Sequence, residues 1–144
     1  MADAVIQAKL ISSGVVPGGG AWEVWQVFNG ELVNATATVD SVVHTAGATY
    51  GFDLTQFRYF GLYVLAASAT GTADLTVQLL QSYNDTAANY VVPDTAGTVD
   101  SALAETAMVY ALAPSPMPRA RLRLVGNAGN PVDTLVSAWL FMQA

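Results

Sequence analysis

The chain has no cysteine among its 144 residues. Disulfide frameworks and thiolate metal sites are therefore excluded, and nothing indicates an oxidising compartment. The chain also lacks an apolar run close to the roughly 20 residues that a membrane-spanning helix needs. Its first residues, MADAVIQAKLISSG, lack the basic region and unbroken apolar run of a secretory signal. We therefore expect a protein made in the cytoplasm, with no membrane as a partner.

Charged residues are scarce. They make up 11% of the chain, against about 25% in ordinary soluble domains, while 53% of the residues are hydrophobic. A chain of 144 residues fits one domain, and a domain of that size leaves much of its surface in water. So few charges on so apolar a chain indicate that other proteins, or copies of the same chain, cover part of the exterior. The net charge of −6 argues against nucleic acid as a partner.

Catalytic and metal-binding motifs are also missing. His44 is the only histidine and no G-x-S-x-G motif is present, so no Ser–His–Asp arrangement is supported. The aspartates are scattered, form no D-x-D-x-D-G loop, and mostly stand beside small or polar residues, where aspartate caps turns. Binding of Ca²⁺ by loop aspartates stays open as an alternative. We expect no enzyme activity, no catalytic residue, no metal site and no cofactor.

What the sequence does contain is strand patterning. Residues 59–68 are apolar at nearly every position, as in a central strand that is covered on both faces, and residues 74–81 alternate. The polar, glycine-bearing loop between them predicts a central hairpin. Asn29-Gly30, between strands expected near 22–28 and 31–39, predicts another hairpin, because both turn residues tolerate positive φ. A final pair of strands is expected at 119–125 and 133–143.

The fold class follows from these elements. Many short strands separated by Gly, Pro and Asn, with no sustained helical period, indicate an all-β protein, an antiparallel β-sandwich of jelly-roll type. Residues 1–144 form a single domain in this interpretation, with residues 1–20 as an edge strand or an extended arm. TVDS recurs at 38–41 and 98–101, and each copy continues with an arginine-led strand and a strand that ends in glutamine. This repeat of about 60 residues suits a jelly roll with two similar halves.

Three of the five basic residues form a stripe at Arg119, Arg121 and Arg123, in alternation with apolar residues. Period two places all three on one face of a strand, about 6–7 Å apart. One interpretation is a docking contact with an acidic surface on a partner or on another copy of the chain. The other is a solvated sheet face, or ion pairing with acids on neighbouring strands.

Trp22 and Trp25 are the other candidates for partner binding. In a strand, a spacing of three residues places them on opposite faces. We expect one of them in the core and the other at an interface or a glycan-binding surface, since aromatic residues are enriched in both settings.

The stretch SYNDT at 82–86, with Asn-Tyr at 89–90, resembles a strand–turn–strand pattern of small β-sandwich proteins from tailed-bacteriophage virions. That group also often ends in an arginine-containing strand, a glycine loop and a strand like VSAWLFMQ, which stands here at 136–143. The likeness covers roughly residues 57–143. The resemblance implies a capsid decoration (cement) protein, or a related minor structural protein, that is located in the virion and stabilises the capsid lattice.

The expected partners are the major capsid protein or another virion protein, and the chain itself as a homo-oligomer. Residues 59–67 and 136–142 are apolar on both strand faces, which indicates that another subunit buries a second sheet face. A trimer is favoured because it matches the local three-fold positions of a capsid lattice. The alternative function is a carbohydrate-binding β-sandwich module for attachment to glycans, with exposed aromatic rings stacked on sugars.

Overall fold

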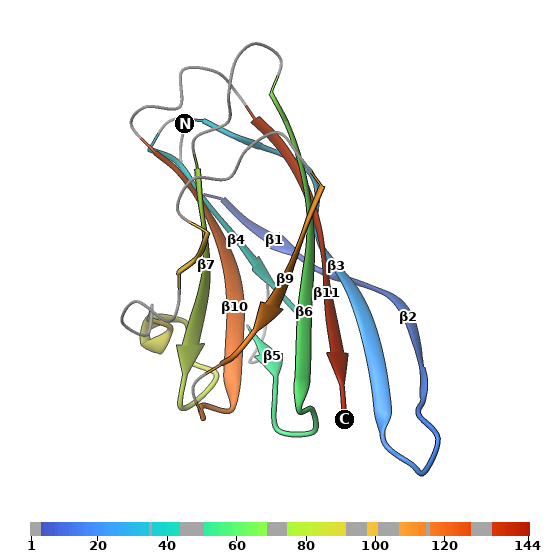
Figure 1. Cartoon of the computed structure of the whole chain (residues 1–144). Coiled ribbons are helices and arrows are strands. Elements are labelled where there is room, and N and C mark those ends of the chain that lie inside the picture. Colours follow the sequence, from blue (N-terminus) through green and yellow to red (C-terminus); the bar gives the residue numbers. More distant parts are fainter. Residues whose placement is uncertain are drawn as a thin grey trace.

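The computed structural model of the chain describes residues 4–34, 36–43, 51–68, 75–91, 98–100, 107–114, 116–127 and 134–144. Two β-sheets pack against each other in it (Figure 1). Sheet 1 contains β1 (Ala4–Gln7), β4 (Thr38–Val42), β5 (Phe52–Asp53), β7 (Leu75–Ser82), β8 (Thr98–Asp100) and β10 (Arg119–Gly126). Sheet 2 contains β2 (Lys9–Val15), β3 (Ala21–Val33), β6 (Tyr59–Ser68), β9 (Ala107–Leu112) and β11 (Thr134–Gln143). The predicted all-β sandwich is confirmed.

The strand order is that of a jelly roll. Along the chain, β3, β6, β9 and β11 lie in sheet 2, whereas β4, β7, β8 and β10 lie in sheet 1. Within the sheets, these strands take the orders β3-β11-β6-β9 and β4-β10-β7-β8, and all neighbouring pairs in the two orders are antiparallel. The chain therefore crosses from one sheet to the other at most of its connections, as in the eight-stranded jelly roll.

The sequence repeat matches this topology in part. A two-fold operation that exchanges the sheets maps β6 onto β10 and β7 onto β11, because each strand of a pair has equivalent neighbours. These are the strands that the repeat equates. The same operation maps β4 onto β9, whereas the two TVDS copies lie at β4 and β8. The two halves are thus similar in arrangement, and the TVDS match is not a structural equivalence.

The core lies between the sheets and follows from strict alternation along the strands. In β10, burial alternates through Ala120, Leu122 and Leu124, and in β11 the even-numbered residues are buried. Period two collects these side chains on one face of each sheet. Full burial of such a Leu or Phe side chain contributes about 1.5–3 kcal/mol. The largest fully buried side chains are Phe28, Phe52, Leu62, Leu75, Leu80, Leu122, Leu124 and Met142.

The hairpin predicted at Asn29-Gly30 is wrong, because β3 continues through these residues. The register of β3 with β11 shifts between Val136 and Ala138, so β3 holds an extra residue there as a β-bulge. Gly30 has a φ of 60°, and its N–H donates to Ser137 Oγ at 2.8 Å. A type I′ turn and a glycine bulge need the same left-handed conformation, so the Asn-Gly signal alone does not distinguish them.

The central hairpin is also wrong, although both of its strands exist. β6 pairs with β11 and β9 in sheet 2, whereas β7 pairs with β10 and β8 in sheet 1. The final pair of predicted strands, β10 and β11, is likewise divided between the two sheets. Alternation of apolar residues tells which face of a strand is buried, but it does not tell which strand lies beside it.

The N-terminal segment forms edge strands rather than a free arm. β1 pairs in parallel with β4 at the edge of sheet 1, and β2 pairs antiparallel with β3 at the edge of sheet 2. The segment therefore crosses from one layer to the other between residues 7 and 9 (Figure 1).

Candidate functional site

The outward-facing side of sheet 2 is apolar although it faces away from the core. β6, β9 and β11 contain no charged residue. Along each of them, more exposed residues alternate with less exposed ones, so apolar side chains lie on both sides of the sheet. We call the outward side chains of sheet 2 the outer face. Its large apolar members are Trp22, Val24, Leu32, Tyr59, Tyr63, Leu65, Val109, Leu135, Trp139 and Phe141.

Two aromatic pairs lie on the outer face. Tyr63 and Trp139 are cross-strand neighbours with ring centroids 5.7 Å apart, and Trp22 stacks on Phe141 at 6.4 Å. Val109 continues the first of these rows on β9 and is 75% exposed. Partly exposed aromatic residues with few charges around them are typical of the centre of a protein interface.

Trp22 and Trp25 lie on opposite faces of β3, as their spacing predicts. The Trp22 indole covers Gly14 on β2 so closely that an added Cβ there would lie 2.6 Å from Trp22 Nε1. Trp25 packs against the core, edge-to-face with Phe52 at 5.4 Å, and its Nε1–H donates to Glu23 Oε1 at 3.0 Å. Trp22 is therefore part of the outer face, and Trp25 belongs to the interior.

Two arginines of the predicted stripe bind one acid on the neighbouring strand. Arg123 Nε donates to Asp40 Oδ1 at 2.6 Å, and its Nη2 donates to Oδ2 at 3.0 Å. Arg121 Nη2 lies 3.1 Å from the same Oδ2. Asp40 is only 5% exposed, so two guanidinium groups share one buried carboxylate. This is the ion pairing within the chain that the sequence left open as the alternative to a docking contact.

Arg119, the third member of the stripe, lies opposite Asp53 of β5. The hydroxyl and the N–H of Thr55 both donate to Asp53 Oδ1, at 2.7 and 3.0 Å. These hydrogen bonds, with a smaller contribution from the positive charge of Arg119, hold the pKa of Asp53 below its ordinary value. Thus each arginine of the stripe has an acid beside it within the chain.

Within the stretch at 82–90, the Asp85 carboxylate accepts hydrogen bonds both from this stretch and from the residue just before β5. Tyr90 donates its hydroxyl to Asp85 Oδ1 at 2.5 Å, and Gly51 N–H donates to the same oxygen at 2.9 Å. The Arg121 guanidinium lies over the Tyr90 ring, 4.9 Å from its centroid. Burial, and then the hydrogen bond with Asp85, raise the pKa of the Tyr90 phenol. These contacts fix the loop in place.

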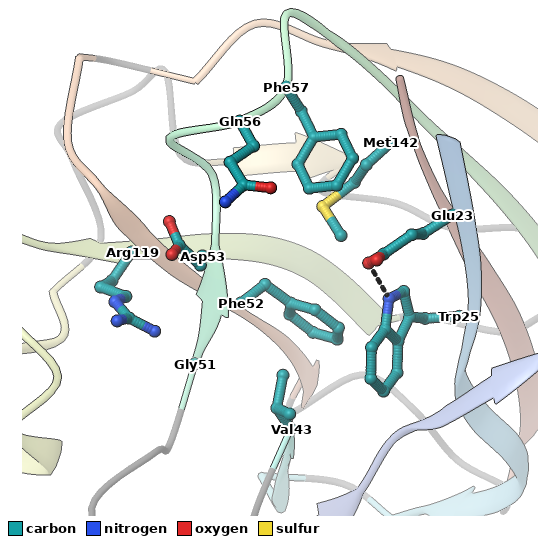
Figure 2. A pocket seen from close by; sticks show the side chains of 10 residues that line it. All are labelled: Glu23, Trp25, Val43, Gly51, Phe52, Asp53, Gln56, Phe57, Arg119 and Met142. Carbon is teal, nitrogen blue, oxygen red and sulfur yellow. Dashed lines mark hydrogen bonds between the residues drawn. The ribbon is translucent and has the colours of Figure 1, made fainter. Parts of the chain in front are cut away.

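A pocket of about 210 Å³ lies beside β5, with Glu23 on one side of Phe52 and Asp53 and Arg119 on the other (Figure 2). Sequence reasoning selected Trp25 and Arg119 but not Glu23, because nothing local links residue 23 to residues near 53 and 119. The pocket is lined by Glu23, Trp25, Val43, Gly51, Phe52, Asp53, Gln56, Phe57, Arg119 and Met142.

Several candidates from the sequence cannot be placed. His44, Asp74, Asp94 and Asp133 lie outside the described residues. Within the described segments, no three His, Cys, Asp or Glu residues come together in a way that could hold a metal ion. The same segments contain no helix with the length and apolar character needed to cross a membrane.

The outer face, the arginine stripe and the pocket are therefore the features on which a functional assignment can draw. The arginine stripe is engaged within the chain, whereas the outer face and the pocket remain open to other molecules. No protein-family model matches the chain, and a search of curated proteins finds no match.

Proposed function

We propose that this protein is a structural component of a bacteriophage virion, and more specifically a decoration protein that binds and stabilises the capsid lattice. One observation carries the proposal, which is the broad, aromatic outer face of sheet 2, whose strands β6, β9 and β11 contain no charged residue. The jelly-roll fold is compatible with it, because viral capsid proteins use this fold. Lectins use it too, so the fold by itself does not assign the function.

The size of the outer face suits a stable protein interface. A face of five strands covers roughly 700 Å², for strands about 4.8 Å apart and about nine residues long. The largest apolar patch on a typical monomer is about 300–600 Å², and a standard interface takes about 800 Å² from each partner. At about 25 cal/mol per Å², burial of this face gives a gross gain on the order of 10–20 kcal/mol, comparable to or larger than the cost of association.

The mechanism is burial of surface rather than chemistry. β6, β9 and β11 carry no charged side chain that a partner would have to desolvate, so this part of the outer face can be covered without the desolvation penalty of an ion. Copies of the chain cover the outer face of one another, with a trimer favoured because it fits the local three-fold positions of a capsid lattice. The assembled oligomer then docks on the major capsid protein or another virion protein.

Purified particles test this proposal. We expect the protein in a copy number that the lattice symmetry fixes, and we expect particles that lack it to lose their contents at a lower temperature. A protein that is missing from particles, or present only in irregular traces, would contradict the proposal. The alternative, a carbohydrate-binding module, predicts saturable retention on a glycan array and no fixed copy number.

A further inference from the structure

The pocket in Figure 2 contains a carboxylate that the proposed function does not use. Glu23 Oε1 accepts the hydrogen bond from Trp25 Nε1 at 3.0 Å (Figure 2). Among the residues that the structure describes, no cation forms an ion pair with Glu23. A partly buried carboxylate in this position therefore lacks a counter-charge that a ligand could supply.

The other charged groups of the pocket do not fill this role. Asp53 and Arg119 lie on the far side of Phe52 from Glu23 (Figure 2). They are register partners on β5 and β10, and Asp53 is also hydrogen-bonded by Thr55. Their opposite charges largely offset each other, which leaves the pocket with one uncompensated negative charge at Glu23.

The rest of the lining is apolar apart from Gln56, and three of its seven residues are aromatic. Trp25, Phe52 and Phe57 contribute rings, and Met142 contributes a thioether that is 2% exposed. Aromatic rings attract cations as well as methylene groups, and Trp attracts them most strongly. The volume of about 210 Å³ is smaller than the roughly 300–1,000 Å³ of sites for drug-sized ligands, so it suits one side chain.

We propose that this pocket binds a lysine side chain of a partner protein, with its aliphatic stem along the aromatic wall and its ammonium group at Glu23. Lysine is the better match than arginine, because a single ammonium group needs only the free oxygen Oε2, whereas paired contact by a guanidinium fork would have to share Oε1 with the Trp25 N–H. A neutral sugar would leave the charge of Glu23 uncompensated. The net charge of −6 also favours the approach of a basic partner. This lysine-binding site does not rest on the proposed role in a virion.

A pair of small probes tests the site on the purified chain. We use Nα-acetyl-lysine methylamide and its Nε-acetylated analogue, which has the same stem but no charge. The readout is the NMR signal of the Trp25 indole N–H, which lies in the pocket and is bonded to Glu23. We expect the charged probe to shift this signal saturably with a Kd in the millimolar range, and the acetylated probe to leave it unchanged at the same concentrations.

A matched pair of variants tests whether the charge of Glu23 binds the probe. Glu23→Gln keeps an oxygen that can accept the Trp25 hydrogen bond but removes the charge, and we expect it to bind the charged probe at least about tenfold more weakly. Glu31→Gln removes the same charge from the same strand outside the pocket, and we expect binding to be unchanged. Equal binding of both probes, equal effects of both variants, or saturable binding of glucose at Trp25 would each overturn the proposal. The probes on the unmodified chain decide the matter even if a variant fails to fold.

Discussion

Asp40 is the acid on which two arginines of β10 depend. Asp40→Asn keeps the size of the side chain but leaves Arg121 and Arg123 without a carboxylate at this position. Removal of one partner of a buried ion pair costs about 3–5 kcal/mol. The arginine side chains are 11% and 27% exposed, so water relieves part of this cost. We expect the free energy of unfolding, measured by urea denaturation, to fall by about 2–3 kcal/mol.

Asp53→Asn is the matched control for this substitution. Asp53 is an exposed acid in the same sheet, and its hydrogen bonds run to Thr55 rather than to a buried cation. We expect its replacement to cost less than about 1 kcal/mol. If the two variants lose the same stability, the carboxylate shared by Arg121 and Arg123 does not hold sheet 1 together.

Tyr90 makes stability sensitive to alkaline pH. Burial, and then Asp85, raise its pKa above the ordinary value of 10.0, so the folded state resists ionisation more than the unfolded state does. The resulting contribution to stability is complete below about pH 10 and is lost as the pH rises above it. We expect the free energy of unfolding to decline more steeply between pH 9 and 11 in the unmodified chain than in Tyr90→Phe. Parallel declines would show that Tyr90 ionises equally easily in both states.

At the scale of elements, the bulge in β3 depends on Gly30. Its φ of 60° is strained for residues with a Cβ, although an added Cβ would meet no atom within 4 Å. We therefore expect Gly30→Ala to lower the free energy of unfolding by about 1 kcal/mol through backbone strain alone. Gly30→Asn should cost less, because Asn tolerates the left-handed region better. Thermal unfolding of the variants checks the order.

Gly61 of β6 is the control for this prediction. It has no positive φ, and an added Cβ would lie 3.8 Å from Tyr110 O, an ordinary contact. Gly61→Ala should therefore be neutral or slightly stabilising, by up to about 0.5–1 kcal/mol. A Gly30→Ala variant as stable as Gly61→Ala would mean that β3 adjusts its backbone to remove the strain.

The extent of several strands could be predicted from the sequence, whereas the extent of β3 and the pairing of the strands could not. Apolar periodicity is local, and it placed strands at 59–68, 74–81 and 119–125 within a residue of β6, β7 and β10. Strand pairing depends on connections that cross between the sheets. The alternation of apolar residues within one strand does not indicate where those connections lead. The Asn29-Gly30 signal identified the need for positive φ but not the bulge that uses it.

The same limit applies to the candidate sites. The opposed faces of Trp22 and Trp25 follow from period two within one strand, and the structure has them. The partner of Arg123 could not be predicted, because Asp40 is 83 residues away along the chain. Glu23 was missed for a related reason, since its importance arises from β5 residues that reach it only in the folded chain. Contacts between distant segments are set by topology rather than by local pattern.

At the scale of the whole molecule, the outer face predicts that the chain associates with itself. Val109 is 75% exposed in the single chain, so Val109→Glu should change the stability of one subunit by no more than about 0.5 kcal/mol. In an oligomer that covers this part of the outer face, the same glutamate would be buried among β6, β9 and β11, which offer it no basic residue. We expect the unmodified chain to scatter light as an oligomer at micromolar concentration, and Val109→Glu to scatter as a 15.0 kDa monomer.

Val91→Glu separates this effect from a general effect of added charge. Val91 is 60% exposed but lies beside Gln81 of sheet 1, away from the outer face. The Val91→Glu substitution adds the same charge as Val109→Glu to a chain whose net charge is already −6, so repulsion between whole subunits rises equally in both variants. The Val91→Glu variant should therefore remain an oligomer. If Val91→Glu dissociates as readily as Val109→Glu, net charge rather than the outer face controls assembly. An unmodified chain that is a monomer and binds no particle would remove the basis of the proposed function.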